Sequence, residues 1–397
     1  MASKIKDRKH FNQYRDQTRV KHEILRKYML AFFQILKGHR NNLVYLDGFA
    51  GRGTYDDSNG SGEKCDGSPL HALKVIAEKP DLAEKVTTIF VEADAENFKS
   101  LSQEIDKFHK AHPAIREPGV HNGTFSDAVD VIISQLEAGG SKLAPTFAFV
   151  DPCGIDGASM QSIKKILSYD RCEAFIFFNI EGVRRVCGLE KLSKTLIDLY
   201  GSEERSQNLT NEISTLKEPA QKEQAMLSAY MQAIYEEIGS DSFVTFFPIE
   251  HEKRKITSHY LIHVTKHSLG YKIMKDVMWK LGVTDEGEGG LGLIQASKYD
   301  SNALFRPNWD AFKDRIQEQL NGKPTKISFF YDDCVKMPDD KFSEPAYREA
   351  LLELESEGRI TILDKDAKTP KPAMKRMKRK GKTTLGQSYY AIAVDYT

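Results

Sequence analysis

Apolar positions along the first half of the chain alternate between two periods. Over residues 21–38 they recur three and four positions apart, which predicts a helix. The apolar run 43–46, which ends at Asp47, predicts a buried parallel strand. Strands that alternate with helices form βαβ units, so we expect an α/β protein with a parallel sheet. Further helices are predicted at 69–77, 95–110, 126–138 and 159–169, and further strands at 86–92, 119–123, 146–150 and 174–178.

A polar and mostly helical segment interrupts this alternation over residues 185–240. Two more strands are expected after it, at 243–249 and 259–265. We therefore predict one α/β domain over residues 21–320 with a helical insertion, preceded by a polar and basic arm at residues 1–20.

The pattern changes beyond Gly322, Lys323 and Pro324, which are typical of a linker. The expected order there is helix, helix, strand, long loop and strand, which is typical of a winged helix. We expect this small second domain over residues 323–397. Its elements are predicted at 327–335, 344–357, 359–363 and 389–394.

Charge is balanced over the whole chain but not along it. Lys and Arg number 57, as do Asp and Glu, which excludes a globally basic nucleic-acid binder but not a local basic patch. Residues 365–382 hold nine Lys or Arg and one acid, and they form the wing of the expected winged helix. Such a wing suits phosphate contacts, although a solvated loop would have the same composition. The candidate contacts are Lys375, Arg376, Lys378, Arg379 and Lys380.

Five scattered cysteines form neither a CxxC pair nor a Cys/His cluster, so we expect neither a disulfide framework nor a metal site. No apolar run approaches the roughly 18 residues needed to span a bilayer. The basic and polar start lacks the apolar region of a secretory signal. A soluble, cytoplasmic protein is the expectation.

The first candidate for chemistry is the run Asp47-Gly48-Phe49-Ala50-Gly51-Arg52-Gly53, which directly follows a predicted strand. Glycines in such a loop let the backbone approach a ligand closely. Two glycines alone are weak evidence for a cofactor site, since an ordinary glycine-rich turn would have the same sequence pattern. An acid at the strand end with small apolar residues after it is, however, typical of sites for S-adenosyl-L-methionine (SAM). The candidate cofactor residues here are Asp47, Gly48, Phe49, Gly51 and Gly53.

Two later strand ends extend this candidate site. Glu92 ends the next strand, where an acid can accept hydrogen bonds from both ribose hydroxyls. Thr124 and Phe125 follow the third strand and could pack against an adenine. Ser126 could equally do no more than cap the following helix. Ser68, with Pro69 behind it, is predicted to cap an earlier helix whose N-terminus could bind a carboxylate.

Asp151 and Pro152 follow the most apolar strand and are the catalytic candidates. Nucleic-acid amino-methyltransferases place an Asp/Asn-Pro-Pro-aromatic motif at this point to hold an exocyclic amine. The second proline and the aromatic are absent here, where Cys153 and Gly154 stand. Asp151 could still bind a substrate amine or act as a general base. The alternative is that Asp-Pro only ends the strand.

These motifs together resemble the three-Cys-motif partner protein family. The resemblance is carried by the runs 21–28, 45–55 and 67–73, by 150–154 and 260–265, and by the expected winged helix. It implies a Rossmann-like methyltransferase fold and association with a radical-SAM-like three-Cys-motif protein. It places the cofactor loop on Asp47, Gly48, Gly51 and Gly53, and the second-strand acid on Glu92. The family tends to have Asp-Pro-Phe-Gly where this chain has Cys153.

We therefore predict a Rossmann-like SAM-methyltransferase sheet followed by a winged helix, acting on nucleic acid. Two rival functions stay open. One is a non-catalytic protein that keeps the fold and binds nucleic acid or a partner, which the incomplete Asp-Pro motif favours. The other is a nucleic-acid hydrolase, for which the acidic run 285–288 is the compact candidate for a metal.

Overall fold

The protein is described by a computed structural model that covers most of the chain and divides it into two compact units. One unit holds the residues up to Val277 and the other those from Gln295 onward, and each is described by itself. The residues that the structure describes are 16–38, 42–56, 64–188, 193–250, 256–282, 309–321, 323–335, 342–373, 376, 378–379, 382–383, 385 and 388–394.

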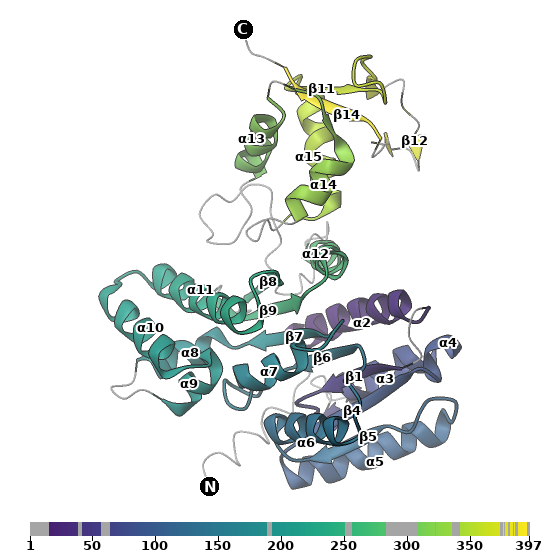
Figure 1. The fold of residues 1–397 in the computed structure, drawn as a ribbon, viewed down its shortest axis with the longest axis vertical. Coiled ribbons are helices and arrows are strands. Elements are labelled where there is room, and N and C mark those ends of the chain that lie inside the picture. Colours follow the sequence, from purple (N-terminus) through teal and green to yellow (C-terminus); the bar gives the residue numbers. More distant parts are fainter. Residues whose placement is uncertain are drawn as a thin grey trace. The chain divides into compact units, whose positions relative to one another are not determined.

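A seven-stranded sheet forms the centre of the first unit (Figure 1). Its order is β5-β4-β1-β6-β7-β9-β8, and the first five of these strands are parallel to one another. β9 runs antiparallel to both of its neighbours. The strands are β1 (Leu43–Asp47), β4 (Val86–Glu92), β5 (Gly119–Asn122), β6 (Thr146–Val150), β7 (Glu173–Phe178), β8 (Phe243–Glu250) and β9 (Thr257–Thr265).

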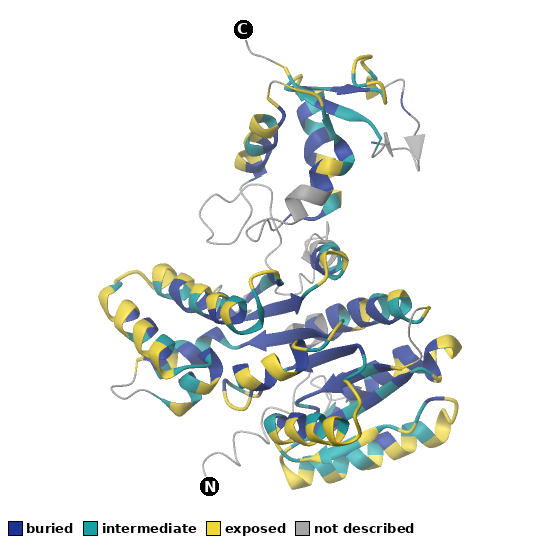
Figure 2. Cartoon of the chain, viewed as in Figure 1, coloured by how far each residue is buried: buried dark blue, intermediate teal, exposed yellow. Residues whose placement is uncertain are grey.

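This order identifies the fold class. Renumbered along the chain, the strands lie in the order 3-2-1-4-5-7-6, a doubly wound sheet with one antiparallel strand inserted near its edge. That is a Rossmann-like sheet, so the fold class predicted for the first domain is confirmed. Every residue of β6 and β7 is buried, and because side chains alternate between faces, both faces are covered (Figure 2). Continuous apolar runs are therefore what these central strands require.

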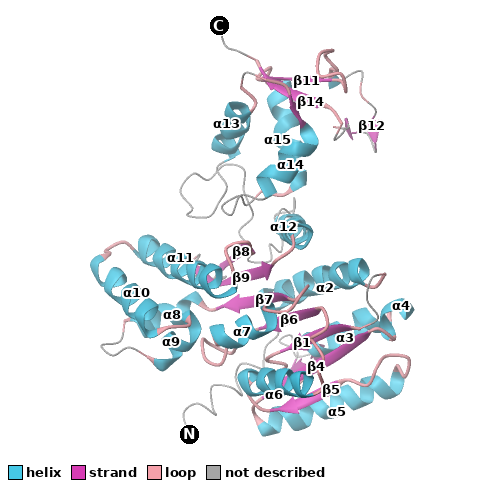
Figure 3. Ribbon diagram, viewed as in Figure 1, coloured by secondary structure: helices cyan, strands magenta, loops and turns pink. Residues whose placement is uncertain are grey.

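Helices cover the sheet as the apolar periodicity predicts (Figure 3). α2 packs on α3, and α3 packs in turn on α5, while α6 packs on α7. The helices that flank the parallel strands are α2 (Asp16–Leu36), α3 (Ser68–Ala77), α4 (Pro80–Ala83), α5 (Ala95–Ala111), α6 (Phe125–Ala138) and α7 (Met160–Leu167), and α12 (Ser268–Gly282) follows β9.

Two local features differ from the sequence predictions. The polar stretch after the glycine loop contains a small hairpin, β2 (Thr54–Asp56) paired with β3 (Lys64–Asp66). The sequence did not predict it, because strands of three residues are too short to show a period. The segment between β7 and β8 is helical as predicted, but its first helix begins earlier, at Ile180. Its helices are α8 (Ile180–Cys187), α9 (Lys194–Tyr200), α10 (Glu203–Thr215) and α11 (Pro219–Ile238).

A buried polar network joins α2 to the sheet at the start of β7. The Glu173 carboxylate accepts hydrogen bonds from the Tyr28 hydroxyl, from Thr265 Oγ1 at 2.8 Å and from His263 Nε2 at 3.0 Å. A Cβ on Gly270 would lie 2.5 Å from Glu173 Oε1, so α12 approaches the network only because residue 270 has no side chain. Burial raises the pKa of Tyr28 well above its usual value, which keeps the phenol a neutral donor.

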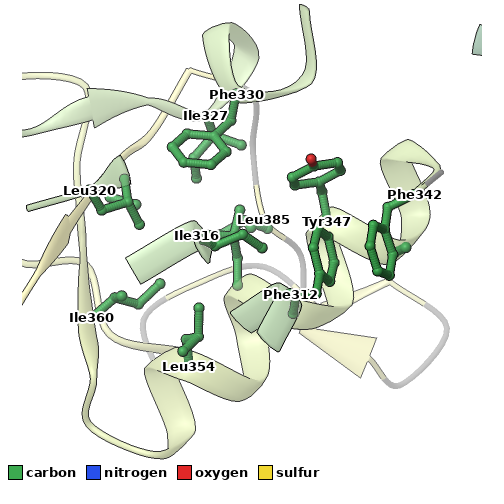
Figure 4. Close-up of a cluster of buried hydrophobic side chains, with 14 of the residues drawn as sticks. Phe312, Ile316, Leu320, Ile327, Phe330, Phe342, Tyr347, Leu354, Ile360 and Leu385 are labelled. Carbon is green, nitrogen blue, oxygen red and sulfur yellow. The ribbon is translucent and has the colours of Figure 1, made fainter. Parts of the chain in front are cut away.

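The second unit has a core of its own, contributed by helices and an antiparallel sheet of order β10-β14-β11 (Figure 4). Trp309, Phe312 and Ile316 of α13 belong to this core. The second unit therefore begins before the linker predicted at residues 322–324. The helix α13, which precedes that linker, packs with its apolar face against α15. The elements are α13 (Trp309–Gln319), β10 (Thr325–Lys326), α14 (Ile327–Val335), α15 (Glu344–Ser356), β11 (Ile360–Leu363), β12 (Lys378–Arg379), β13 (Lys382–Thr383) and β14 (Tyr390–Ala393).

The Glu173 network predicts a large stability effect from a single hydroxyl. Tyr28→Phe should lower the free energy of unfolding by about 1–3 kcal/mol, because it removes a donor from a buried carboxylate. Tyr230→Phe is the matched control, since the equally buried Tyr230 hydroxyl has no hydrogen-bond partner among the described residues. Urea unfolding of both variants checks this, and equal losses would show that the network contributes nothing.

Candidate functional site

Three predicted site segments meet at one edge of the sheet. β1, β4 and β6 are adjacent and parallel, so Asp47, Glu92 and Asp151, at or just after their last residues, lie at the same carboxyl edge. In doubly wound sheets ligands bind at this edge.

The glycine loop is tied to both neighbouring strands. Gly48 N donates to Phe149 O and Ala50 N donates to Val91 O, each at 2.9 Å. Gly51 and Gly53 then take positive φ angles of 64° and 83°, in the left-handed region that glycine adopts without strain. The tight turn that the GxG spacing suggested is thus present, and it brings backbone to the strand ends.

Asp47 is fully buried beneath this loop. Its carboxylate accepts from Phe49 N at 3.2 Å, and Tyr45 Oη lies 3.4 Å away. Burial raises the pKa of Asp47 to about 7, and the nearby Asp151 adds to the rise, while hydrogen bonds from Ser68 and Phe49 oppose it. Asp47 is therefore hydrogen-bonded to the backbone of the loop, and its pKa lies near neutrality.

Glu92 is half-buried at the end of β4. Burial raises its pKa, and Glu92 Oε1 accepts from Asp94 N at 2.7 Å. Asp94 has a separate role, because its carboxylate accepts from Glu96 N and Asn97 N and so caps α5. Glu92 also accepts hydrogen bonds from the Gly51 backbone and from the Asn97 side chain, so it is tied to the glycine turn and to α5.

Thr124 and Phe125 lie near the glycine loop, and each also stabilises the fold. Thr124, and not Ser126, caps α6, in a capping box with Asp127. Phe125 is buried with its ring centroid 5.7 Å from that of Phe49. A Cβ on Gly48 would lie 2.6 Å from Phe125 Cδ2, so Gly48 is needed for this packing.

At the start of α3 the cap also differs from the prediction. Gly67 is the N-cap residue, and Ser68 is the first residue of the helix, with Pro69 behind it. A Cβ on Gly67 would lie 2.9 Å from Gly53 O, to which Gly67 N donates at 2.8 Å. The close approach of two backbones thus replaces a side-chain cap and brings α3 to the glycine loop.

Asp151 has a partner that the sequence did not indicate. Lys21, on the second turn of α2, pairs its ammonium with Asp151 Oδ2, and both side chains are largely buried. The ammonium also lies 4.7 Å from the centroid of the Phe177 ring. Pro152 is buried behind Asp151, and Cys153 is exposed beside it. Because 130 positions separate the two charges, no local pattern could have joined them.

Two histidines were also missed. His22 follows Lys21 into the interior, and its ring centroid lies 4.7 Å from that of His71 on α3. Burial lowers the pKa of both histidines, well below the usual value for His22. Both are therefore neutral at physiological pH and can offer a hydrogen bond without adding charge.

The wing candidates have different environments. The Arg376 side chain is fully buried and pairs with Glu355, so Arg376 is a structural residue and not an open phosphate contact as predicted. Lys378 and Arg379 form β12, which pairs with β13. Lys375 and Lys380 lie outside the described residues.

The hydrolase alternative would need a cluster of acids that holds a metal. In the described part of the chain, no group of three or more His, Cys, Asp or Glu side chains is arranged to hold a metal ion. The acidic run 285–288 lies outside that part. None of the described helices is long and apolar enough to cross a bilayer.

A cavity of about 280 Å³ lies elsewhere on the first unit, where β7 begins. α2 and α12 line it with apolar side chains such as Phe32 and Leu269, and Glu173 lies among them. Since β7 begins at the edge opposite the glycine loop, this cavity is separate from the candidate site.

Comparisons with known proteins found solved structures of low similarity only. No family model matches the chain, and no curated protein matches its sequence. The DUF519 protein LPL1258 from Legionella pneumophila is 12% identical, with a TM-score of 0.39 over 64% of this chain and 85% of that one. Trm1 from Pyrococcus horikoshii, solved with SAM, is 8% identical, with a TM-score of 0.31 over 66% and 58%. The methyltransferase domain of bacterial CtHen1 is 9% identical, with a TM-score of 0.31 over 63% and 97%.

The environment of Asp47 predicts how stability depends on pH. Between about pH 4 and pH 7 the folded protein keeps a proton on Asp47 that the unfolded chain has released, so stability falls as pH rises. The loss should reach up to roughly 4 kcal/mol, at about 1.4 kcal/mol per pH unit. Asp47→Asn removes this titration. Urea unfolding at pH 4.5–7.5 should therefore show a shallower decline in the variant, and parallel curves would contradict the assignment.

Proposed function

We propose that the protein binds SAM at the carboxyl edge of its sheet and transfers a methyl group to an amine of nucleic acid. One observation carries the proposal. A glycine turn with two left-handed residues, the acid Glu92 at the next strand end and a buried Asp151–Lys21 pair all lie at that edge. A cofactor loop, a ribose acceptor and a polar group for the substrate are what such a transfer needs.

The assignment of cofactor residues rests on their positions along the edge. We assign the turn at Gly51 and Gly53 to the methionine part of SAM, and Glu92 to the ribose hydroxyls. Phe49 and Phe125 pack beside the loop, where an adenine would find an apolar surface. Neutral His22 and His71 lie near the start of α3 and can donate to a carboxylate without opposing it.

Asp151 and Lys21 would act on the accepting group. When bound, SAM supplies a methyl group on a positively charged sulfur, and the new N–C bond forms as the C–S bond breaks. Asp151 accepts a hydrogen bond from the amine, directs its lone pair and takes up the released proton. A carboxylate has about four acceptor positions, so it can keep Lys21 and still hold the amine. Lys21, paired on one side and stacked on Phe177, fixes the carboxylate in place.

The second unit supports nucleic acid as the substrate. Its order of helix, strand, two helices and two strands around a three-stranded antiparallel sheet is typical of a winged helix, and the basic segment 365–382 lies between β11 and β14. The resemblance to the three-Cys-motif partner family adds a radical-SAM-like partner to the proposal. The rival is a non-catalytic binder, which Cys153 in place of an aromatic favours. A methyl-transfer assay decides between them.

The cofactor site predicts the effect of one glycine substitution. Gly51→Val should weaken SAM binding at least tenfold, because a branched side chain is strained at positive φ and fills the turn. Gly38→Val is the control, since no atom lies within 4 Å of a Cβ on Gly38. Calorimetry with SAM and with its demethylated product measures both. No binding to the wild type at millimolar ligand would remove the cofactor site.

The role proposed for Asp151 predicts a change in the transfer rate and not in SAM binding. Asp151→Ala should lower the rate of transfer by at least 100-fold while leaving the Kd for SAM within a few-fold, because the residue acts on the transition state. Asp156→Ala, which removes an exposed carboxylate from the same loop, should change neither. A parallel loss of SAM affinity in Asp151→Ala would instead assign Asp151 to the cofactor site.

Lys21→Met tests whether Lys21 positions Asp151. Its kcat should fall while the Kd for SAM stays within a few-fold, because the carboxylate loses the cation that fixes it. Circular dichroism checks that the variant folds, since an unpaired buried charge is costly. An unchanged kcat, or an equal loss of SAM affinity, would contradict this role.

A further inference from the structure

The cavity at the start of β7 has mostly apolar walls. They come from α2 and α12, which contribute Phe32, Ile35, Leu36, Leu269 and Ile273. Its volume of about 280 Å³ is close to the lower end of the range for ligand pockets, roughly 300–1,000 Å³. Water makes few hydrogen bonds against such walls, so a small apolar molecule can displace it favourably.

The cavity does not result from loose packing of α12. Gly270, in the first turn of this helix, lies so close to the sheet that an added Cβ would be 2.5 Å from Glu173 Oε1 and 3.0 Å from the Tyr28 hydroxyl. The open volume therefore lies beside a tightly packed contact. Ile35 and Leu269 line it and are still 39% and 44% exposed, so they border its opening to solvent.

Arg171 lines the same cavity with donors that are available to a ligand. Its Nε lies 3.4 Å from an oxygen of the exposed Asp170 carboxylate, and a surface pair of this kind contributes little. Its terminal nitrogens have no other hydrogen-bond or ionic partner among the described residues. The backbone of Arg171 has a φ of 55°, which is unfavourable for a residue with a side chain, and such strain clusters at ligand sites.

The other charged or ionisable side chains of the cavity do not occupy these donors. Glu173 already accepts hydrogen bonds from three donors of its own network. His267 Nδ1 accepts from Leu269 N at 3.3 Å, which places the proton of the neutral ring on Nε2 and makes Nε2 a donor. The polar side of the cavity therefore offers donors from Arg171 and His267. A planar guanidinium matches the two oxygens of a carboxylate.

We propose that this cavity binds a small molecule with an apolar chain and a carboxylate. The chain lies between α2 and α12, and the carboxylate pairs with Arg171. Because the cavity is at the edge of the sheet opposite the glycine loop, the inference goes beyond the proposed methyl transfer and does not rest on it.

Calorimetry of the full chain with octanoate, octanol and octylamine tests the class of ligand, since these probes share a chain and differ in head group. The wild type should bind octanoate saturably and about tenfold more tightly than octanol or octylamine, because a hydrogen bond to a charged group is gained. Arg171→Gln should weaken octanoate binding about tenfold and leave the Kd for octanol within a few-fold.

Two further variants make the test independent of misfolding. Arg171→Gly relieves the positive φ, so its melting temperature should be at least that of the wild type while the preference for octanoate over octanol is lost. Leu269→Glu adds an acid at the opening and should weaken octanoate binding. Val131→Glu is the matched control, since Val131 is 43% exposed on α6 and does not line the cavity; it should leave the binding unchanged.

Four outcomes would overturn the inference. No binding of octanoate to the wild type at millimolar concentration would remove the site. Equal affinity for octanoate and octanol would show that Arg171 contributes nothing to recognition. Tighter binding of octylamine would assign the head group to Glu173. An equal loss of octanoate affinity in Val131→Glu and Leu269→Glu would reduce the effect to overall charge.

Discussion

The ion pair between Lys21 and Asp151 is the contact on which the candidate site depends. It joins the helix that precedes the sheet to the end of a central strand, and it does so with both charges largely out of water. Breaking one side of such a pair costs several kcal/mol, because the remaining charge has no partner. The pair therefore fixes the start of α2 over the carboxyl edge, and it brings His22 to His71 beside the glycine loop.

The same requirement, that a buried charge must have a partner, is met at both edges of the sheet. At the start of β7, Glu173 is surrounded by the donors Tyr28, His263 and Thr265, and the network joins helix to sheet. At the carboxyl edge, Asp47 is buried with a raised pKa and accepts from Phe49 N, and Glu92 accepts from the backbone of Asp94 and of Gly51. Backbone donors thus hold the acids of the carboxyl edge to the glycine loop, whereas side-chain donors hold Glu173 to α2 and β9.

In the second unit the distribution of charge matters more than its total. Nine basic residues in one segment indicated a nucleic-acid contact, but they are not equivalent. Arg376 is buried against Glu355 of α15, and Lys378 and Arg379 form the strand β12. The buried Arg376 contributes to the fold of the unit and leaves fewer cations of this segment for a ligand.

The sequence by itself determined the central strands and the alternation of strands with helices, since strands buried on both faces must be continuously apolar and flanking helices must show the 3.6-residue period. It also indicated the glycine turn, because only glycine takes the φ values found at Gly51 and Gly53 without strain. The three-residue strands β2 and β3 escaped it because they are shorter than any period. Only the tertiary structure decided that Lys21 meets Asp151, that Gly67 rather than Ser68 caps α3, and that Arg376 turns inward. These are contacts between distant segments, or close approaches of two backbones, and no local pattern of residue types records which segments the fold will bring together.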